Sequence, residues 1–110
     1  MAHRPAQFER LRASDVADWL HRHPGCLILD ARDEAHHARG HLPGSVRLDG
    51  RNHEALLMRE ARSRPVFIYC YHGNSSQTYA EMFCDFGFAT VSDLIGGWDA
   101  WAQAPLDEKA

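Results

Sequence analysis

The sequence predicts a single α/β domain in which a mainly parallel β-sheet is covered by helices on both faces. Two observations predict this fold class. Short apolar runs alternate with amphipathic stretches along the chain, as in β-α repeats. The 110 residues also provide enough chain for one hydrophobic core but not for two. We therefore take residues 1–110 as one domain.

The first half of the chain predicts two helices and two strands. Ser14 and Asp15 begin an amphipathic helix, with Ser14 supplying the N-cap hydroxyl, and Pro24-Gly25 ends it. The run CLILD at 26–30 predicts a strand buried on both faces. Three shorter elements follow: a helix at 33–40, a turn at 41–44 and a second strand at 45–49.

The second half repeats the alternation. Asn52 is the expected cap of a helix over 53–63, and VFIYC at 66–70 is the clearest buried strand of the chain. A further helix over 76–87 ends at Gly87. The remaining expected elements are a strand at 89–94, a loop and short helix at 96–104, and a frayed tail at 105–110.

Composition excludes several classes of function. A formal charge of −3 disfavours binding to nucleic acid or to an anionic membrane surface. No apolar run approaches the ~20 residues that a membrane-spanning helix needs. The first ten residues lack the apolar segment of a secretory signal, so we expect a cytoplasmic protein. Three cysteines, an odd number, do not fit a disulfide framework.

The chemistry is expected where the best strand ends. Cys70 closes the strand at 66–70, and Asp30 closes the strand at 26–30. Parallel sheets place their sites at the carboxyl ends of the strands. Polar residues 71–76 (YHGNSS) then connect Cys70 to a helix N-terminus, where backbone N–H groups and the helix dipole favour an anion. A thiol in such a loop ionises readily and needs no general base.

The alternative is that Cys70 is a small packed thiol that completes a strand. A run of Gly, Asn and two Ser residues directly between strand and helix has no use in core packing, whereas a loop that binds an anion needs it. The sequence therefore favours Cys70 as a nucleophile.

Four motifs in the same order resemble the rhodanese family, specifically its short single-domain bacterial thiosulfate sulfurtransferases. The resemblance covers about residues 8–101, which we take as the domain core. The motifs are LILDARD (27–33), RGHLPGS (39–45), CYHGNS (70–75) and GGWDAW (96–101). Each motif alone is weak, but four in the family's order are specific.

The resemblance implies a five-stranded, mainly parallel rhodanese-like sheet and a ping-pong transfer of sulfur. Cys70 would take the outer sulfur of thiosulfate as a persulfide and pass it to cyanide, to a thiol, or to a dithiol such as thioredoxin. No cofactor beyond this covalent persulfide is expected, and no metal. Asp30 and Arg32 would support the site. The expected substrate- and persulfide-binding residues are Tyr71, His72, Gly73, Asn74, Ser75 and Ser76.

This chain departs from many family members because its loop contains no Lys or Arg. Thiosulfate would then be held by backbone amides, hydroxyls and His72, which predicts modest affinity. Arg32 is expected to pair with an acid such as Asp33, Glu34 or Asp49. His36, His37 and His41 could suggest zinc, but Gly40 interrupts their helix and no cysteine pair accompanies them.

Three other functions were weighed. A phosphatase or arsenate reductase of the tyrosine-phosphatase type would need an Arg six residues after the cysteine, where this chain has Ser76. An inactive regulatory module would usually lack the cysteine. A carrier that receives persulfide sulfur from a partner protein remains open, because the same residues would serve it.

Overall fold

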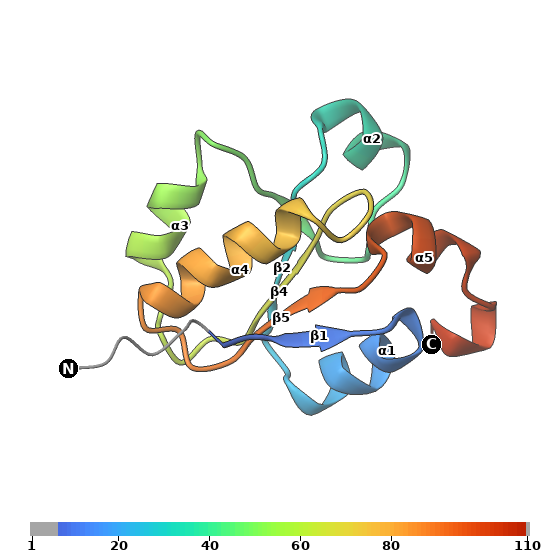
Figure 1. Ribbon diagram of the computed structural model, residues 1–110, viewed down its shortest axis with the longest axis horizontal. Helices are drawn as coiled ribbons and strands as arrows, with labels where there is room; N and C mark the ends of the chain where they lie inside the picture. The colour runs from blue at the N-terminus through green and yellow to red at the C-terminus, as the bar shows by residue number, and fades with distance from the viewer. Residues whose placement is uncertain (1–6, 110) are drawn as a thin grey trace.

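The computed structural model describes residues 7–109 and confirms the α/β class (Figure 1). Five parallel strands form one sheet in the order β1-β5-β4-β2-β3. The strands are β1 (Glu9–Leu11), β2 (Leu27–Asp30), β3 (Val46–Arg47), β4 (Val66–Tyr69) and β5 (Val91–Leu94). The helices are α1 (Ala13–Arg22), α2 (Glu34–Arg39), α3 (His53–Arg59), α4 (Ser75–Asp85) and α5 (Gly97–Gln103), followed by the 3₁₀ helix η1 (Leu106–Glu108).

Strand β4 lies at the centre of the sheet, and every one of its residues is buried. Its alternate side chains enter two separate cores, as the pleat of a strand requires. Val66 and Ile68 pack with α3 and α4 on one face, while Phe67 and Tyr69 pack with α1 and α5 on the other. This double burial explains why the strand is apolar without alternation.

Two predicted helix caps are replaced by other contacts. Helix α1 begins at Ala13, and the carboxylate of Asp15 accepts from the backbone N–H of Arg12, so Ser14 is not the cap. Asn52 is the N-cap residue of α3, but its side chain makes no cap hydrogen bond. That side chain instead bonds the backbone on either side of the exit from β3, at Arg47 and Asp49.

Two further differences concern the edges of the fold. Strand β1 was not predicted, and it exists through its parallel pairing with β5. The tail, expected to fray, instead forms η1, where the Lys109 ammonium lies 5.8 Å from the centre of the Trp101 ring. Within residues 7–109, no helix is both long and apolar enough to cross a membrane.

Candidate active site

Cys70 lies directly after β4, in the loop that leads into α4 at the carboxyl edge of the sheet. Only 2% of the residue is exposed. Strand β4 is paired with β2 on one side and β5 on the other, so the position of this cysteine is set by the central strand of the sheet. The predicted location of the thiol, at the end of a buried strand, is confirmed.

The loop curls around the sulfur. The backbone N–H groups of Gly73 and Ser76 donate to Cys70 Sγ at 3.2 and 3.4 Å, and Ser76 Oγ lies 3.4 Å from the same sulfur. Gly73 permits this turn because its φ of +88° is costly for other residues. The same amides that contact a thiol can stabilise a thiolate, because N–H donors favour the anion.

Burial alone would disfavour the charged sulfur. Hydrogen bonds from Ser76, through its hydroxyl and its backbone, and from the backbone of Gly73 and His72 outweigh that effect and lower the pKa of Cys70. Cys26 shows the contrast, since burial raises the pKa of its thiol to about 12. Burial also raises the pKa of Cys84. All three cysteines are free thiols, but only the Cys70 environment favours ionisation.

The first turn of α5 holds the backbone of the loop in place. The backbone N–H of Trp98 donates to the Cys70 carbonyl at 2.8 Å, and that of Asp99 donates to the Tyr71 carbonyl at 3.2 Å. Gly97 makes this approach possible, because a Cβ there would lie 2.6 Å from both carbonyl oxygens. Gly97, the second glycine of the C-terminal motif, therefore allows the two backbone segments to approach closely.

Two residues that the sequence did not single out support the loop from the sheet side. Arg10 of β1 donates to both oxygens of Asp93 in β5, at 2.9 and 3.1 Å, and to the Gly73 carbonyl at 2.9 Å. Asp93 is fully buried and accepts from Ser76 Oγ at 2.8 Å. The one signal for Arg10 and Asp93 in the sequence was the presence of an acidic residue, Asp93, within a predicted strand.

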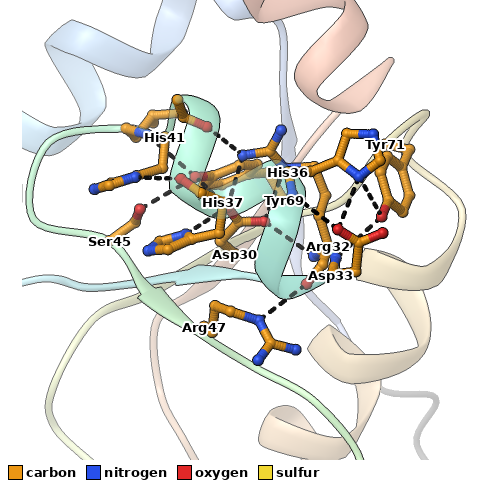
Figure 2. Close-up of polar contacts among 12 residues, drawn as sticks. Asp30, Arg32, Asp33, His36, His37, His41, Ser45, Arg47, Tyr69 and Tyr71 are labelled. Carbon is orange, nitrogen blue, oxygen red and sulfur yellow. Dashed lines mark hydrogen bonds and ion pairs between the residues drawn. The ribbon is translucent and has the colours of Figure 1, made fainter.

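The loop side chains of Tyr71 and His72 point to the rim. The Tyr71 hydroxyl accepts from the backbone N–H of Asp33 at 3.0 Å, which ties the loop to the start of α2 (Figure 2). His72 Nδ1 lies 3.1 Å from Asp99 Oδ2, and both side chains are largely exposed. The His72 side chain is thus exposed to solvent at the edge of the loop.

Asn74 and Ser75 are exposed, and they lead into α4 without a side-chain cap hydrogen bond. Gln77, one helical turn further along, donates from its amide to the Gly73 carbonyl at 2.8 Å. At the start of α4, the backbone N–H of Ser76 is directed at the Cys70 sulfur, and that of Gln77 donates to the Asn74 carbonyl. Residues 70–76 thus run from the end of β4 into the first turn of α4.

Asp30 and Arg32 form a buried ion pair (Figure 2). Two Arg32 nitrogens donate to the Asp30 carboxylate at 3.0 and 2.8 Å, and one donates to the Gly40 carbonyl at 2.6 Å. Asp30 also accepts from the Tyr69 hydroxyl, and the Arg32 guanidinium lies 4.2 Å from the Trp98 ring. The acids expected to pair with Arg32, which were Asp33, Glu34 or Asp49, were wrong, because its side chain donates to Asp30 two residues earlier.

This ion pair supports the site through its neighbours. The Tyr69 hydroxyl also accepts from the backbone N–H of Leu42 and contacts Ser45 Oγ, each at 3.1 Å, which anchors the turn at 41–44 beside the residue that precedes Cys70. Burial disfavours the charged form of Asp30, but hydrogen bonds from Arg32 and its other partners prevail and lower its pKa.

The histidines near α2 have structural partners. His37 Nδ1 lies 2.8 Å from Asp30 Oδ2, and His41 Nδ1 lies 2.7 Å from the His37 carbonyl (Figure 2). Within residues 7–109, no group of three or more His, Cys, Asp or Glu side chains could hold a metal ion.

Comparisons with known proteins agree with this geometry. The family model for the rhodanese-like domain matches residues 12–104. The thiosulfate sulfurtransferase GlpE of Pseudomonas aeruginosa is 34% identical over 101 residues, covering 91% of this chain and 90% of that protein. A second protein of the same name, from Pseudoalteromonas translucida, is 39% identical over 83 residues, covering 76% of this chain and 78% of its own length.

A solved structure has the same fold. The crystal structure of a rhodanese-related protein from Thermoplasma volcanium superimposes with a TM-score of 0.74 at 20% identity, covering 87% of this chain and 92% of that one. At this identity the likeness concerns the fold alone.

Proposed function

The chain belongs to the rhodanese-like domain family, and on this premise we propose that it is a thiosulfate sulfurtransferase whose sulfur carrier is Cys70. In the proposed reaction Cys70 takes the outer sulfur of thiosulfate as a persulfide and then passes it to a nucleophilic acceptor. The activity rests on the chain's own residues and the covalent intermediate, without a further cofactor.

One observation supports the proposal above the others. Cys70 Sγ is surrounded by N–H and hydroxyl groups from Gly73 and Ser76, and these contacts lower the pKa of the thiol. The attacking form of a cysteine is the thiolate. A loop that stabilises an anionic sulfur therefore prepares the nucleophile for the first half of the reaction.

The two half-reactions balance as follows. The Cys70 thiol first loses its proton to solvent. The thiolate attacks the outer sulfur of thiosulfate, an Sγ–S bond forms, and sulfite leaves with the electron pair of the broken sulfur–sulfur bond. An acceptor, either cyanide or a thiolate, then attacks the outer sulfur of the persulfide, and the Cys70 thiolate is regenerated.

The outer sulfur of the persulfide is itself anionic, and the loop residues 71–76 are the groups proposed to hold it. Backbone N–H groups of the loop and the N-terminus of α4 provide the favourable dipoles, with His72 at the rim. Since the loop contains no fixed positive charge, we expect modest affinity for thiosulfate.

The physiological acceptor in this proposal is a thiol or dithiol such as thioredoxin. We place the protein in the cytoplasm, where thiols are kept reduced and can serve as acceptors. Cyanide serves as the acceptor in the assay, where the product is thiocyanate.

A phosphatase activity is less well supported. A loop that binds phosphate dianions by the tyrosine-phosphatase arrangement needs an Arg at position 76. This chain has a buried serine there, and its hydroxyl contacts the buried carboxylate of Asp93.

Mass spectrometry tests the proposal directly. Incubation with thiosulfate should add the mass of one sulfur atom to the protein, and cyanide should remove it as thiocyanate. Cys70→Ala should do neither, whereas the control Cys84→Ala, in which a different thiol is removed, should behave as the wild type. An active Cys70→Ala protein, or a wild type that never gains sulfur, would refute the assignment.

The acceptor is tested separately, with the persulfide already formed. The rate of sulfur release to reduced thioredoxin is compared with the rates of release to cyanide and to a small monothiol. Faster transfer to the dithiol at equal concentration is expected. A wild type that gains sulfur only from a persulfide-bearing partner protein, and not from thiosulfate, would assign it as a relay carrier instead.

A further inference from the structure

The Ser76 hydroxyl lies between two groups that compete for its single proton. Ser76 Oγ is 2.8 Å from Asp93 Oδ2 and 3.4 Å from Cys70 Sγ. A hydroxyl has one O–H to donate, so it serves one of these groups at a time. All three side chains are almost fully buried, and water has little access to take over either contact.

While Cys70 is a thiol, the Ser76 hydroxyl donates its hydrogen bond to Asp93. A carboxylate accepts a hydrogen bond about twice as strong as a neutral acceptor does, and the shorter distance agrees with donation to Asp93. Ser76 Oγ then presents its lone pairs to the sulfur. The thiol completes this arrangement because its S–H can donate to Ser76 Oγ.

Ionisation of Cys70 reverses the preference. A thiolate has no proton to donate, so the Ser76 lone pairs would face an anion. Turning the O–H towards Sγ removes that conflict, but Asp93 then loses a hydrogen bond inside the protein. Arg10 limits the loss because it donates to both oxygens of Asp93, at 2.9 and 3.1 Å.

We propose that Arg10 and Asp93 are positioning residues that set how readily Cys70 ionises, by controlling which of its two neighbours the Ser76 hydroxyl serves. The inference deepens the proposed sulfurtransferase function and rests on it. Asp93 favours the thiol and Arg10 favours the thiolate. In the persulfide the charge moves to the outer sulfur, and the hydroxyl returns to Asp93.

The charged side chains around Cys70 differ in how far they are exposed to solvent. Within residues 7–109, β1 supplies Arg10, β5 supplies Asp93, and α5 supplies Asp99, which is exposed and paired with His72 of the loop. The Asp99–His72 pair lies at the solvent-facing rim, where water screens it. Asp93 and Arg10 act from the buried side, with Asp93 joined to the sulfur by one hydroxyl.

The test measures ionisation without any sulfur donor. Reduced protein is alkylated with iodoacetamide across a range of pH, and the rate at Cys70 is followed by peptide mass spectrometry. Asp93→Asn should lower the pH midpoint of alkylation by about one unit, because a competing negative charge is removed. Arg10→Met should raise the midpoint by about one unit. Arg10→Lys, which keeps the charge, should have a midpoint close to that of the wild type.

A double-variant comparison separates the hydroxyl from simple charge repulsion. In a Ser76→Ala background, Asp93→Asn should shift the midpoint by less than half as much as in the wild type, since no shared hydroxyl remains. Circular dichroism confirms that each variant is folded. If Asp93→Asn does not fold, the proposal is tested by Arg10→Met, which should have a raised pH midpoint of alkylation, and by Arg10→Lys, which should have a midpoint close to that of the wild type.

Two outcomes would overturn the inference. One is an Asp93→Asn midpoint that is unchanged or raised, and the other is an Arg10→Met midpoint that does not rise. These results are independent of the proposed function, because alkylation needs no thiosulfate. A protein that shows the expected shifts but gains no sulfur would refute the sulfurtransferase assignment and leave the Arg10–Asp93 effect intact.

Discussion

Replacing Gly97 with alanine should displace the loop that contains Cys70, and the structure allows the free-energy cost to be worked out. Gly97 has a φ of +60°, which costs an L-residue about 1–2 kcal/mol. A Cβ at this position would also lie 2.6 Å from the carbonyl oxygens of both Cys70 and Tyr71. Because the obstructing atoms are backbone, a rotamer change cannot relieve the clash.

The loop must therefore move away from α5. That movement weakens the two hydrogen bonds from Trp98 and Asp99 to the loop, each worth about 1 kcal/mol. Together with the backbone strain, we expect Gly97→Ala to lower the free energy of unfolding by about 3–4 kcal/mol. A displacement of about 1 Å at the nucleophile is expected to lower kcat/KM for thiosulfate on the order of 100-fold.

Gly25 provides a matched control. Its φ is +81°, and a Cβ there would meet no atom within 4 Å, so Gly25→Ala carries the strain without the clash. Urea unfolding of the two variants should differ by about 2 kcal/mol, or about 1 M in midpoint at an m-value of about 2 kcal/mol/M. Equal midpoints together with unchanged kcat/KM in Gly97→Ala would refute the conclusion that Gly97 is needed for the close approach of α5 to the loop.

Three further predictions concern charge. Asp30→Asn should destabilise the fold at pH 7 by about 3 kcal/mol, because a buried guanidinium loses its partner. The pKa of Asp30 is lowered in the folded protein, so this stabilisation is present above the ordinary carboxyl pKa and is lost as the pH falls through the pKa of the folded state. Urea unfolding from neutral to acidic pH should therefore show that the difference in free energy of unfolding between the variant and the wild type becomes smaller. His72→Lys should lower the KM for thiosulfate about threefold by adding a fixed cation at the rim, and more in an Asp99→Asn background where no carboxylate competes; an unchanged KM in both would contradict this. Cys26, whose pKa is raised to about 12, should stay unmodified by iodoacetamide at pH 8 while Cys70 reacts, and peptide mass spectrometry that finds Cys26 modified first would be the contrary result.

The parts of the fold that depend on local sequence could be predicted. A strand buried on both faces must be apolar throughout, and VFIYC at 66–70 shows this directly. A loop of small polar residues between that strand and a helix indicates an anion site for equally local reasons. The central strand, the loop and the location of Cys70 therefore follow from short stretches of chain.

Features that depend on distant partners could not be predicted. Strand β1 has only three residues and two of them are exposed, so it carries no apolar signal and becomes a strand by pairing with β5. Arg10 and Asp93 are 83 positions apart in the chain, and nothing in either neighbourhood indicates the other. Arg32 shows the same difficulty at short range, because several carboxylates were available and geometry selected Asp30.

The way the loop is anchored has a consequence for biosynthesis. Its backbone is fixed by Arg10 from one direction and by the Trp98 and Asp99 amides from the other, so the loop contacts span residues 10–99. A nascent chain that has emerged from the ribosome only as far as Cys70 has the thiol but not the surroundings that promote its ionisation. These contacts come from residues far apart in the sequence, so the surroundings of Cys70 are complete only in the folded domain. We therefore expect the Cys70 thiol to ionise less readily in the unfolded chain.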